Sequence, residues 1–487
     1  MYVNLLKKIA VYLLTLVLII LPVLPNHVYA NEATLEKGIN KTVSQKLSKA
    51  KVGISIRDFN QKMVYEHNGN LGIKPASNMK LLTAATTLKT LGEGYRFKTE
   101  MYIDGKVENG ILNGNVYLLG QGDPTISQKD LENFAGALKT KLGIKQINGQ
   151  LIADATWFDA EYLMRGVVKE DEWKYFAPQI SALTLSPDTD YDVGNLIVTA
   201  TPTKKGAQAK ITLTPRTNHV AIVNQTKTVA KGYKNTVSIQ RQYGTNRIII
   251  SGNMPIGQSE KEYVTVDNPA MYTLDVLTLA MKSQGITLSR SFGLKLGKVP
   301  VGATKITTKQ SMPLKDIVKV NLKDSNNGMS EMFTKAIGRA VSNEGSWDAG
   351  IKVIYNYAAS LGLNTNEWKI VDTSGLSHVN RITANEQTKL LWAVRQEGYY
   401  DTFLAGLPVA GNPDKNISTT LQKRLTNSYT RNRVHAKTGA ITGVYSLSGY
   451  VHAKSGQWYI FSILTQDTTA SAISGIDEIV TTIAKEM

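Results

Sequence analysis

The chain has 487 residues, of which 42% are apolar and 20% are charged, and this composition excludes a disordered or fibrous protein. The length exceeds that of one typical hydrophobic core, so we expect a folded protein of several domains. The absence of cysteine excludes disulfide bonds, thiolate chemistry and a lipid anchor on cysteine, and the formal net charge is +17.

The first thirty residues, 1–30, predict a signal peptide. Two lysines precede the apolar run 9–24, and a Val-Tyr-Ala sequence ending at Ala30 fits a signal-peptidase cleavage site. The apolar run is shorter than the roughly 18–20 residues of a membrane-spanning helix, and Pro22 interrupts its end. We therefore expect an exported protein, with an uncleaved membrane anchor as the less favoured alternative.

The positive net charge indicates which partners an exported protein would meet. The basic residues are scattered, and the sequence has no basic helix or aromatic RNA-binding motif, so we expect no nucleic acid partner. An anionic wall polymer or membrane surface fits the charge better. A soluble surface without any such partner is an equally open alternative.

The elements that follow alternate between helical and strand-like patterns. A helix is expected from residue 34, two alternating strand-like runs lie within 51–68, and a second helix begins at Pro75 and ends at Gly92. From about residue 94 to residue 313 the pattern changes to short alternating segments separated by Gly, Asn and Asp, typical of hairpin-linked β-structure. A helical and aromatic stretch interrupts this region.

Helices return after Pro313, on either side of a break at "DSNNG", and the chain ends in three strand-like runs and a helix with an isoleucine-rich face. The two ends of the mature chain, 31–93 and 314–487, therefore predict one α/β domain of a multi-domain protein. We assign 94–115 together with 188–313 to a β-rich inserted domain. Residues 116–187 are expected to form a second domain nested within it.

Lys80 occupies an otherwise apolar helix, three residues after Ser77. On a helix this spacing places both side chains on one face, with Cβ atoms about 5–6 Å apart. A lysine acts as a base only when neutral, and burial or a neighbouring positive charge lowers its pKa accordingly. The Ser77 N–H, near the helix N-terminus, is placed to stabilise an oxyanion. Taken alone, this short pattern more often marks a surface lysine beside an N-cap serine.

Two later segments carry further candidate residues. "DSNNG", residues 324–328, is by itself a turn with good helix N-cap residues. In "HAKTGAITG", Gly439 lies within a strand, where it allows another backbone to approach, and Lys437 offers a cation to a carboxylate. A peptide can bind such a strand edge as an extra strand. The alternative is a bulge beside a solvated lysine.

Together the three segments resemble the motif set of the penicillin-binding proteins and serine β-lactamases: Ser-x-x-Lys, Ser-x-Asn and Lys-Thr-Gly. The long gap between the first two motifs is similar to the low-molecular-mass class C D-alanyl-D-alanine carboxypeptidases and endopeptidases, the DacB and DacC type of peptidase family S13. The resemblance covers nearly the whole mature chain, including "LLGQGDPT", "YFAPQISAL" and "DTSGLS". Thr373 stands where that family is expected to carry glycine. The motif residues are Ser77, Lys80, Ser325, Asn327, Lys437, Thr438 and Gly439.

The resemblance implies a role for each of these residues. Ser77 would be the acylated nucleophile and Lys80 its base, while Ser325 would relay a proton to the leaving amine. The remaining residues would bind substrate, with Asn327 holding an amide and Lys437 also helping to keep Lys80 neutral. The terminal carboxylate of the substrate and the oxyanion would be held by Lys437, Thr438, Gly439 and the N–H of Ala440.

The resemblance also implies a fold and a function. The fold is a β-lactamase-like domain, an antiparallel sheet flanked by helices, and the function is that of an exported serine D-alanyl-D-alanine carboxypeptidase or peptidoglycan endopeptidase acylated by β-lactams. No cofactor is implied, and the six histidines show no metal-ligand spacing. A β-lactamase is the alternative enzyme, although no Glu-x-x-Leu-Asn segment for a deacylating water is found. A non-catalytic wall-binding protein is the third reading.

The insertion is expected to control access of bulky wall material and to take no part in acyl transfer. Within it, Asp154 is a candidate partner for the ammonium group of a diaminopimelate side chain. The alternative for Asp154 is an ordinary solvated or turn carboxylate.

Overall fold

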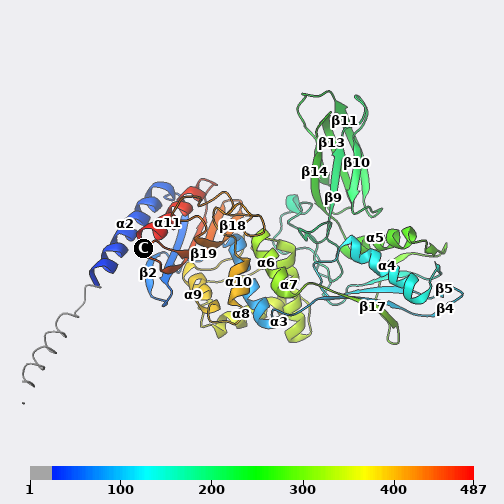
Figure 1. Cartoon of the computed structure of the whole chain (residues 1–487), viewed down its shortest axis with the longest axis horizontal. Coiled ribbons are helices and arrows are strands. Elements are labelled where there is room, and N and C mark those ends of the chain that lie inside the picture. The colour runs from blue at the N-terminus through cyan, green and yellow to red at the C-terminus, as the bar shows by residue number, and fades with distance from the viewer. Residues whose placement is uncertain (1–24) are drawn as a thin grey trace, which may run out of the picture.

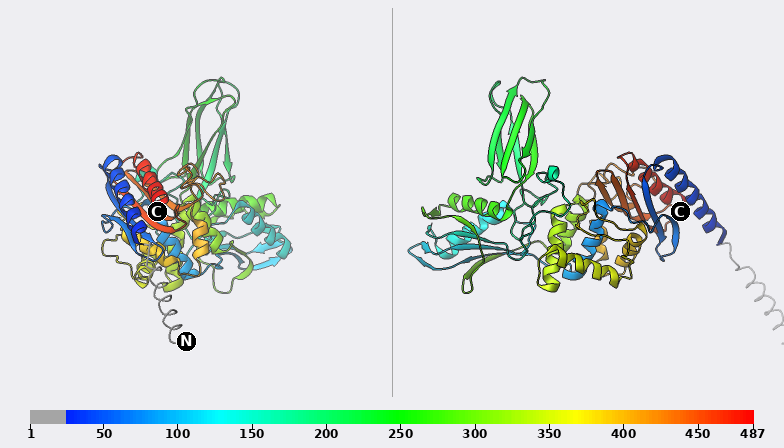
Figure 2. Two further views of the ribbon diagram at one scale, coloured as in Figure 1. Left: turned by 60° about the vertical axis from the view of Figure 1, so that its left-hand side comes forward. Right: turned by 180° about the vertical axis from the view of Figure 1, so that it is seen from behind.

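The computed structural model describes residues 25–487, so most of the predicted signal peptide, 1–30, lies outside the described residues. Figure 1 shows a sheet with surrounding helices at one end of the longest axis, a mixed α/β body at the other end, and a narrow β-structure that projects away from this axis. The rear view in Figure 2 shows the same three parts, and both views of that figure show the β-structure projecting. The predicted multi-domain α/β fold is confirmed.

The first part is built on a five-stranded antiparallel sheet with the strand order β18-β19-β20-β1-β2. It joins the two ends of the described chain, because β1 pairs with β20 along its whole length, from Lys51 opposite Gln466 to Asp58 opposite Tyr459. The strands are β1 (Lys51–Asp58), β2 (Met63–His67), β18 (Val434–Ile441), β19 (Val444–His452) and β20 (Trp458–Gln466).

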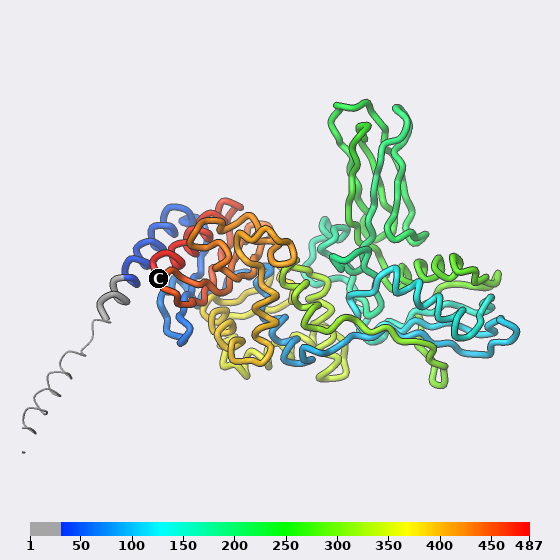
Figure 3. The backbone as a smooth tube through the Cα atoms, in the orientation of Figure 1, coloured from blue at the N-terminus to red at the C-terminus, as the bar shows by residue number. Residues whose placement is uncertain are grey.

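Helices cover both faces of this sheet. On one face α2 (Pro25–Lys46) packs against α11 (Ala472–Glu486), and Figure 3 shows these first and last helices side by side. The isoleucine-rich face of α11 is buried there, as the spacing predicted. The other face contacts the helical part of the domain, which consists of α3 (Met79–Leu91), α6 (Leu314–Asp324), α7 (Asn327–Ser342), α8 (Trp347–Ser360), α9 (Ala384–Val394) and α10 (Tyr400–Gly406).

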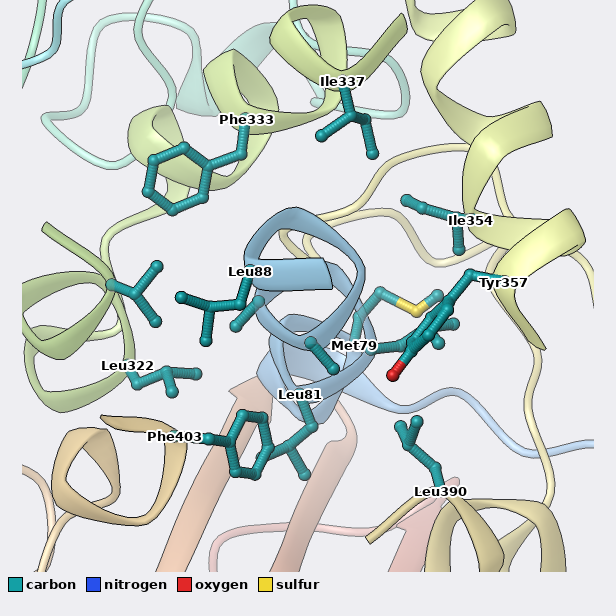
Figure 4. Packing of buried hydrophobic residues seen from close by; sticks show 14 of the residues in the cluster. Met79, Leu81, Leu88, Leu322, Phe333, Ile337, Ile354, Tyr357, Leu390 and Phe403 are labelled. Atoms are coloured by element: carbon teal, nitrogen blue, oxygen red, sulfur yellow. The ribbon is translucent and has the colours of Figure 1, made fainter. Parts of the chain in front are cut away.

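Helix α3 lies at the centre of this helical part. Figure 4 shows α3 enclosed by apolar side chains from the surrounding helices, including Leu322, Phe333, Ile354 and Phe403. Ten consecutive residues of α3, from Met79 to Leu88, are buried. A helix that is buried on all sides removes any charge on it from water, and this fact determines the chemistry of Lys80.

The mixed α/β body is formed by the parts of the insertion on either side of residues 195–265, which form the projecting β-structure. Its larger sheet has the order β16-β8-β6-β3-β17 and its smaller sheet the order β15-β7-β5-β4, with two helices packed beside them. The elements are β3 (Lys98–Ile103), β4 (Lys106–Glu108), β5 (Ile111–Asn113), β6 (Val116–Gly120), α4 (Gln128–Leu142), β7 (Gln146–Ile147), β8 (Leu151–Asp154), α5 (Pro269–Ser283), β15 (Thr287–Leu288), β16 (Leu294–Leu296) and β17 (Thr304–Gln310).

The separate β-structure consists of two three-stranded sheets, β10-β9-β14 and β11-β13-β12. It projects from the molecule in Figure 1. Its strands are β9 (Asn195–Thr201), β10 (Lys210–Thr214), β11 (Ala221–Val229), β12 (Ser238–Arg241), β13 (Arg247–Pro255) and β14 (Glu260–Thr265).

These pairings correct the predicted nesting of the insertion. Residues 116–187 do not form a separate unit, because β6 pairs with β3 and β8 pairs with both β6 and β16 in the larger sheet. The segment that stands apart is 195–265. The boundary was predicted from local helix and strand preferences. Strand pairing depends on partners that are distant in the sequence, which local preferences do not report.

Candidate active site

Ser77 and Lys80 come together at the start of α3. Ser77 lies in a single 3₁₀ turn, η1 (Ala76–Asn78), which runs directly into α3, so its N–H lies at the amino end of that helix. The Lys80 ammonium lies 3.0 Å from Ser77 Oγ. The predicted contact between the two side chains is therefore present.

The Lys80 side chain has no exposed surface, and its Nζ contacts three oxygen atoms. Besides Ser77 Oγ, these are Asn327 Oδ1 at 2.7 Å and the Ser374 carbonyl oxygen at 2.7 Å. A neutral amine has two N–H groups and one lone pair. With both N–H groups donated to Asn327 and Ser374, the lone pair is left to accept the Ser77 hydroxyl proton.

Burial lowers the pKa of Lys80 to about 7, although the charges of Asp372 and Glu331 act in the opposite direction. Both carboxylates are themselves buried and hydrogen-bonded. Glu331 accepts the N–H groups of Thr373 and Ser374. Burial, followed by the charge of Glu331, raises the pKa of Asp372 to about 7. A lysine whose pKa is lowered in this way can lose its proton near neutral pH, which is the property that a general base would need.

The second motif follows the end of α6. Ser325 adopts a left-handed backbone conformation with φ of 61°, and α7 starts two residues later at Asn327. The Lys437 ammonium donates to Ser325 Oγ at 2.9 Å, while Asn327 Oδ1 accepts from Lys80. The loop that carries Ser325 and Asn327 therefore contacts both lysines, Lys437 through Ser325 and Lys80 through Asn327.

The third motif lies on β18, at one edge of the five-stranded sheet. Lys437 is fully buried, and burial together with the charge of Lys80 lowers its pKa well below the usual value. Its ammonium also donates to the Thr438 carbonyl oxygen at 3.0 Å. Because two buried ammonium groups repel each other, protonation of one of the two lysines disfavours protonation of the other.

Gly439 has a packing reason for its lack of a side chain. A Cβ atom there would lie 2.2 Å from Ser446 Oγ and 2.9 Å from both Asn78 Nδ2 and the Pro75 carbonyl oxygen. The backbone that approaches Gly439 closely is therefore the segment before Ser77. The glycine allows β18 to lie against the turn that carries Ser77.

A cavity of about 700 Å³ opens over these residues. Ser77, Ser325, Asn327 and Ala440 line it from the sheet and helix side, whereas the two buried lysines lie beneath the surface. Much of the opposite wall comes from the insertion, through Gly166–Val168, Asp171, Lys174–Phe176 and Asp192.

Asp154 is not among the residues that line the cavity. It is only 4% exposed; one carboxylate oxygen accepts from the N–H and hydroxyl of Thr156, and the other accepts from the Val299 N–H. Asp154 therefore does not face the cleft, and the alternative of a turn carboxylate is the correct one, because its oxygens accept from backbone N–H groups and a threonine hydroxyl after the end of β8.

The sequence motifs do not reveal the part played by the residues packed behind them, which include Asp372 and Thr373 of the segment "DTSGLS". Glu331 and Asp372 shape the surroundings of Lys80, and Thr373 is buried with its hydroxyl 2.6 Å from that of Thr334. The sequence signal available for Glu331 was a single acidic residue in the otherwise uncharged start of α7, one turn after Asn327. A lone charge in such a buried stretch needs hydrogen-bond partners. Asn326, the middle residue of its motif, was also overlooked.

Among the described residues, no cluster of three or more His, Asp or Glu side chains is arranged to hold a metal ion. In residues 25–487 there is likewise no helix with the length and apolarity to cross a membrane.

The amino-acid sequence is similar to those of several D-alanyl-D-alanine carboxypeptidases. The chain is 35% identical over 413 residues to a D-alanyl-D-alanine carboxypeptidase from Actinomadura sp. (strain R39), covering 84% of this chain and 76% of that protein. It is 23% identical over 431 residues to the D-alanyl-D-alanine carboxypeptidase DacB of Haemophilus influenzae, covering 86% of each chain.

The fold is also similar to a solved structure. The crystal structure of penicillin binding protein 4 (dacB) from Haemophilus influenzae superposes with a TM-score of 0.79 and 20% identity, covering 92% of this chain and 99% of that one. The sequence profile of the D-Ala-D-Ala carboxypeptidase 3 (S13) family matches residues 35–486. Because this match spans nearly all of the described residues, the chain belongs to the D-Ala-D-Ala carboxypeptidase 3 (S13) family.

Proposed function

We propose that this protein is an exported serine D-alanyl-D-alanine carboxypeptidase that remodels peptidoglycan through an acyl-enzyme on Ser77, and that β-lactams acylate the same serine. The observation that carries the proposal is the Ser77 hydroxyl oxygen 3.0 Å from a fully buried lysine whose pKa is lowered to about 7. Endopeptidase cleavage of cross-links uses the same acyl-transfer chemistry and is part of the proposal.

In the proposed first step, Ser77 Oγ attacks the carbonyl carbon of the penultimate D-alanine and transfers its proton to Lys80. The N–H groups of Ser77 and Ala440 stabilise the oxyanion. Collapse of the tetrahedral intermediate breaks the C–N bond of the peptide, and the proton held by Lys80 passes through Ser325 to the leaving amine, which leaves Lys80 neutral again for the deacylation step. Water then hydrolyses the acyl-enzyme and regenerates the Ser77 hydroxyl.

Substrate binding uses the open edge of β18 in this proposal. Lys437 and Thr438 hold the terminal carboxylate, Asn327 holds an amide, and the extended peptide lies along Gly439 and Ala440 as an added strand. The positive net charge, which is +15 without the two lysines of the predicted leader, supports attachment to an anionic wall polymer or membrane surface. Export rests on the predicted leader.

Incubation with a fluorescent penicillin and, separately, with a D-Ala-D-Ala pentapeptide tests the function. We expect a stable covalent label on the protein and release of D-alanine from the peptide. Rapid loss of the label with penicillin hydrolysis would instead identify a β-lactamase. Absence of both labelling and D-alanine release would indicate a non-catalytic wall-binding protein. A muropeptide digest separates carboxypeptidase from endopeptidase products.

The second-order rate of penicillin acylation is expected to increase with pH through a midpoint near 7. Below this pH Lys80 holds a proton and cannot accept one from Ser77; above it, the neutral amine is the dominant form. Because burial raises the pKa of Asp372 and the charge of Asp372 acts on Lys80, the midpoint reflects both groups. A profile measured between pH 5.5 and about 8.5, with circular dichroism as the control for folding, tests this. A flat profile would contradict Lys80 as the titrating base.

A further inference from the structure

The insertion touches the catalytic loop directly, through the middle residue of the Ser-x-Asn motif. Asn326 Nδ2 donates to the Tyr191 carbonyl oxygen at 3.1 Å, to Asp192 Oδ1 at 3.1 Å and to the Asp190 carbonyl oxygen at 3.4 Å. All three acceptors lie in the inserted segment before β9.

The other groups of Asn326 bind the catalytic domain. Its Oδ1 accepts from the Met329 N–H at 2.9 Å and so caps α7, and its own N–H donates to the Asn321 carbonyl oxygen at 3.1 Å. The residue is 5% exposed. Asn326 is therefore a buried connection between two parts of the molecule that are distant in sequence.

Its neighbours on both sides are residues of the proposed mechanism. Ser325 accepts the hydrogen bond from Lys437, and its left-handed backbone conformation is one that a serine rarely adopts without support. Asn327 accepts from Lys80 and donates through Nδ2 to the Phe176 carbonyl oxygen at 2.9 Å, which is a second contact with the insertion. A shift of the loop would move both side chains away from the two lysines.

We propose that Asn326 is a positioning residue that clamps the catalytic loop to the insertion, so that the insertion takes part in acyl transfer even to small substrates. This differs from the sequence-based expectation that the insertion controls only access of bulky wall material. The expected effect on the acylation rate rests on the proposed acyl-enzyme function. The contact between Asn326 and the insertion can be tested without that function.

The amide oxygen of Asn326 caps α7, whereas its amide nitrogen binds the insertion, so substitutions can remove one contact and keep the other. Asn326→Asp keeps the oxygen that caps α7, because aspartate is as good an N-cap residue as asparagine. It replaces the amide donor with a carboxylate that faces two carbonyl oxygens and Asp192. Asn326→Ser is a second, neutral variant, which retains a capping oxygen and lacks the donor.

Asn268→Asp is the matched control. Asn268 caps α5 by accepting from the Met271 N–H at 3.2 Å, and it does not line the cavity. The same substitution there changes a helix cap without touching the catalytic loop.

Two measurements test the proposal: the rate of acylation by a small penicillin, and amide hydrogen exchange in residues 188–193 of the full-length protein. Because small misplacements of reacting groups are costly, we expect both Asn326 variants to acylate about 10–100-fold more slowly while the control keeps the native rate. Exchange in 188–193 should increase in the Asn326 variants alone.

Native acylation rates in both Asn326 variants would overturn the proposal, as would unchanged exchange in 188–193. If one variant fails to fold, the other decides the question. If the unsubstituted protein is not labelled at all, the proposed function fails, and the exchange measurement still decides whether Asn326 holds the interface.

Discussion

Replacing Ser77 with alanine is expected to abolish covalent labelling by penicillin and release of D-alanine. The substitution removes the only atom of the site that the mechanism requires to form a covalent bond with substrate. Stability should change little, because Ser77 is only partly buried and the hydrogen bond that Lys80 makes to its hydroxyl is one of three that hold the lysine. We expect the melting temperature to stay within about 3 °C of the native value.

The labelling experiment needs a serine control. Ser360 ends α8, makes its hydrogen bond to the Tyr357 carbonyl oxygen and does not line the cavity. Ser360→Ala should be labelled at the native rate. Labelling of Ser77→Ala at that same rate would show that another residue is acylated, and would end the assignment of Ser77 as the nucleophile.

Lys80→Arg is expected to reduce the acylation rate by at least about 10²-fold, the lower end of what a positioned general base contributes. A guanidinium has a pKa above about 12 and cannot accept the Ser77 proton at working pH. The Lys80 amine contacts three oxygen atoms in its buried site, and burial lowers its pKa to about 7. Arginine is larger than lysine and does not lose its proton in this pH range.

Lys437→Arg is the matched comparison, because Lys437 is also a fully buried lysine of the site. Its proposed task is to present positive charge to the substrate carboxylate and to keep Lys80 neutral. A guanidinium keeps that charge, although its planar fork changes the contact with Ser325. This variant should therefore retain a measurable part of the acylation rate.

The second-order rate of penicillin acylation, measured on folded samples of both variants, decides between the two lysines. The Lys80→Arg variant should also lose the increase of rate with pH near 7. If Lys80→Arg acylates as fast as Lys437→Arg, then Lys80 is not the base. The proton from Ser77 would then have to go to another group.

The sequence by itself determined the local elements and the residue types of the site. The apolar spacing of α11 and the strand-like runs of β18, β19 and β20 are short-range patterns, and the structure has these elements at the expected positions. The contact of Ser77 with Lys80 was also predictable, since a spacing of three residues on a helix fixes their proximity.

Only the tertiary structure decided which distant segments meet. Sheet pairing placed 116–154 in the body of the insertion and left 195–265 apart. Hydrogen bonds from Thr156 and Val299 hold the Asp154 carboxylate away from the cleft. The contacts of Asn326 with the insertion arise in the same way. Hydrogen bonds and burial between residues more than a hundred positions apart depend on how whole elements pack, and no local pattern in a single sequence reports that packing.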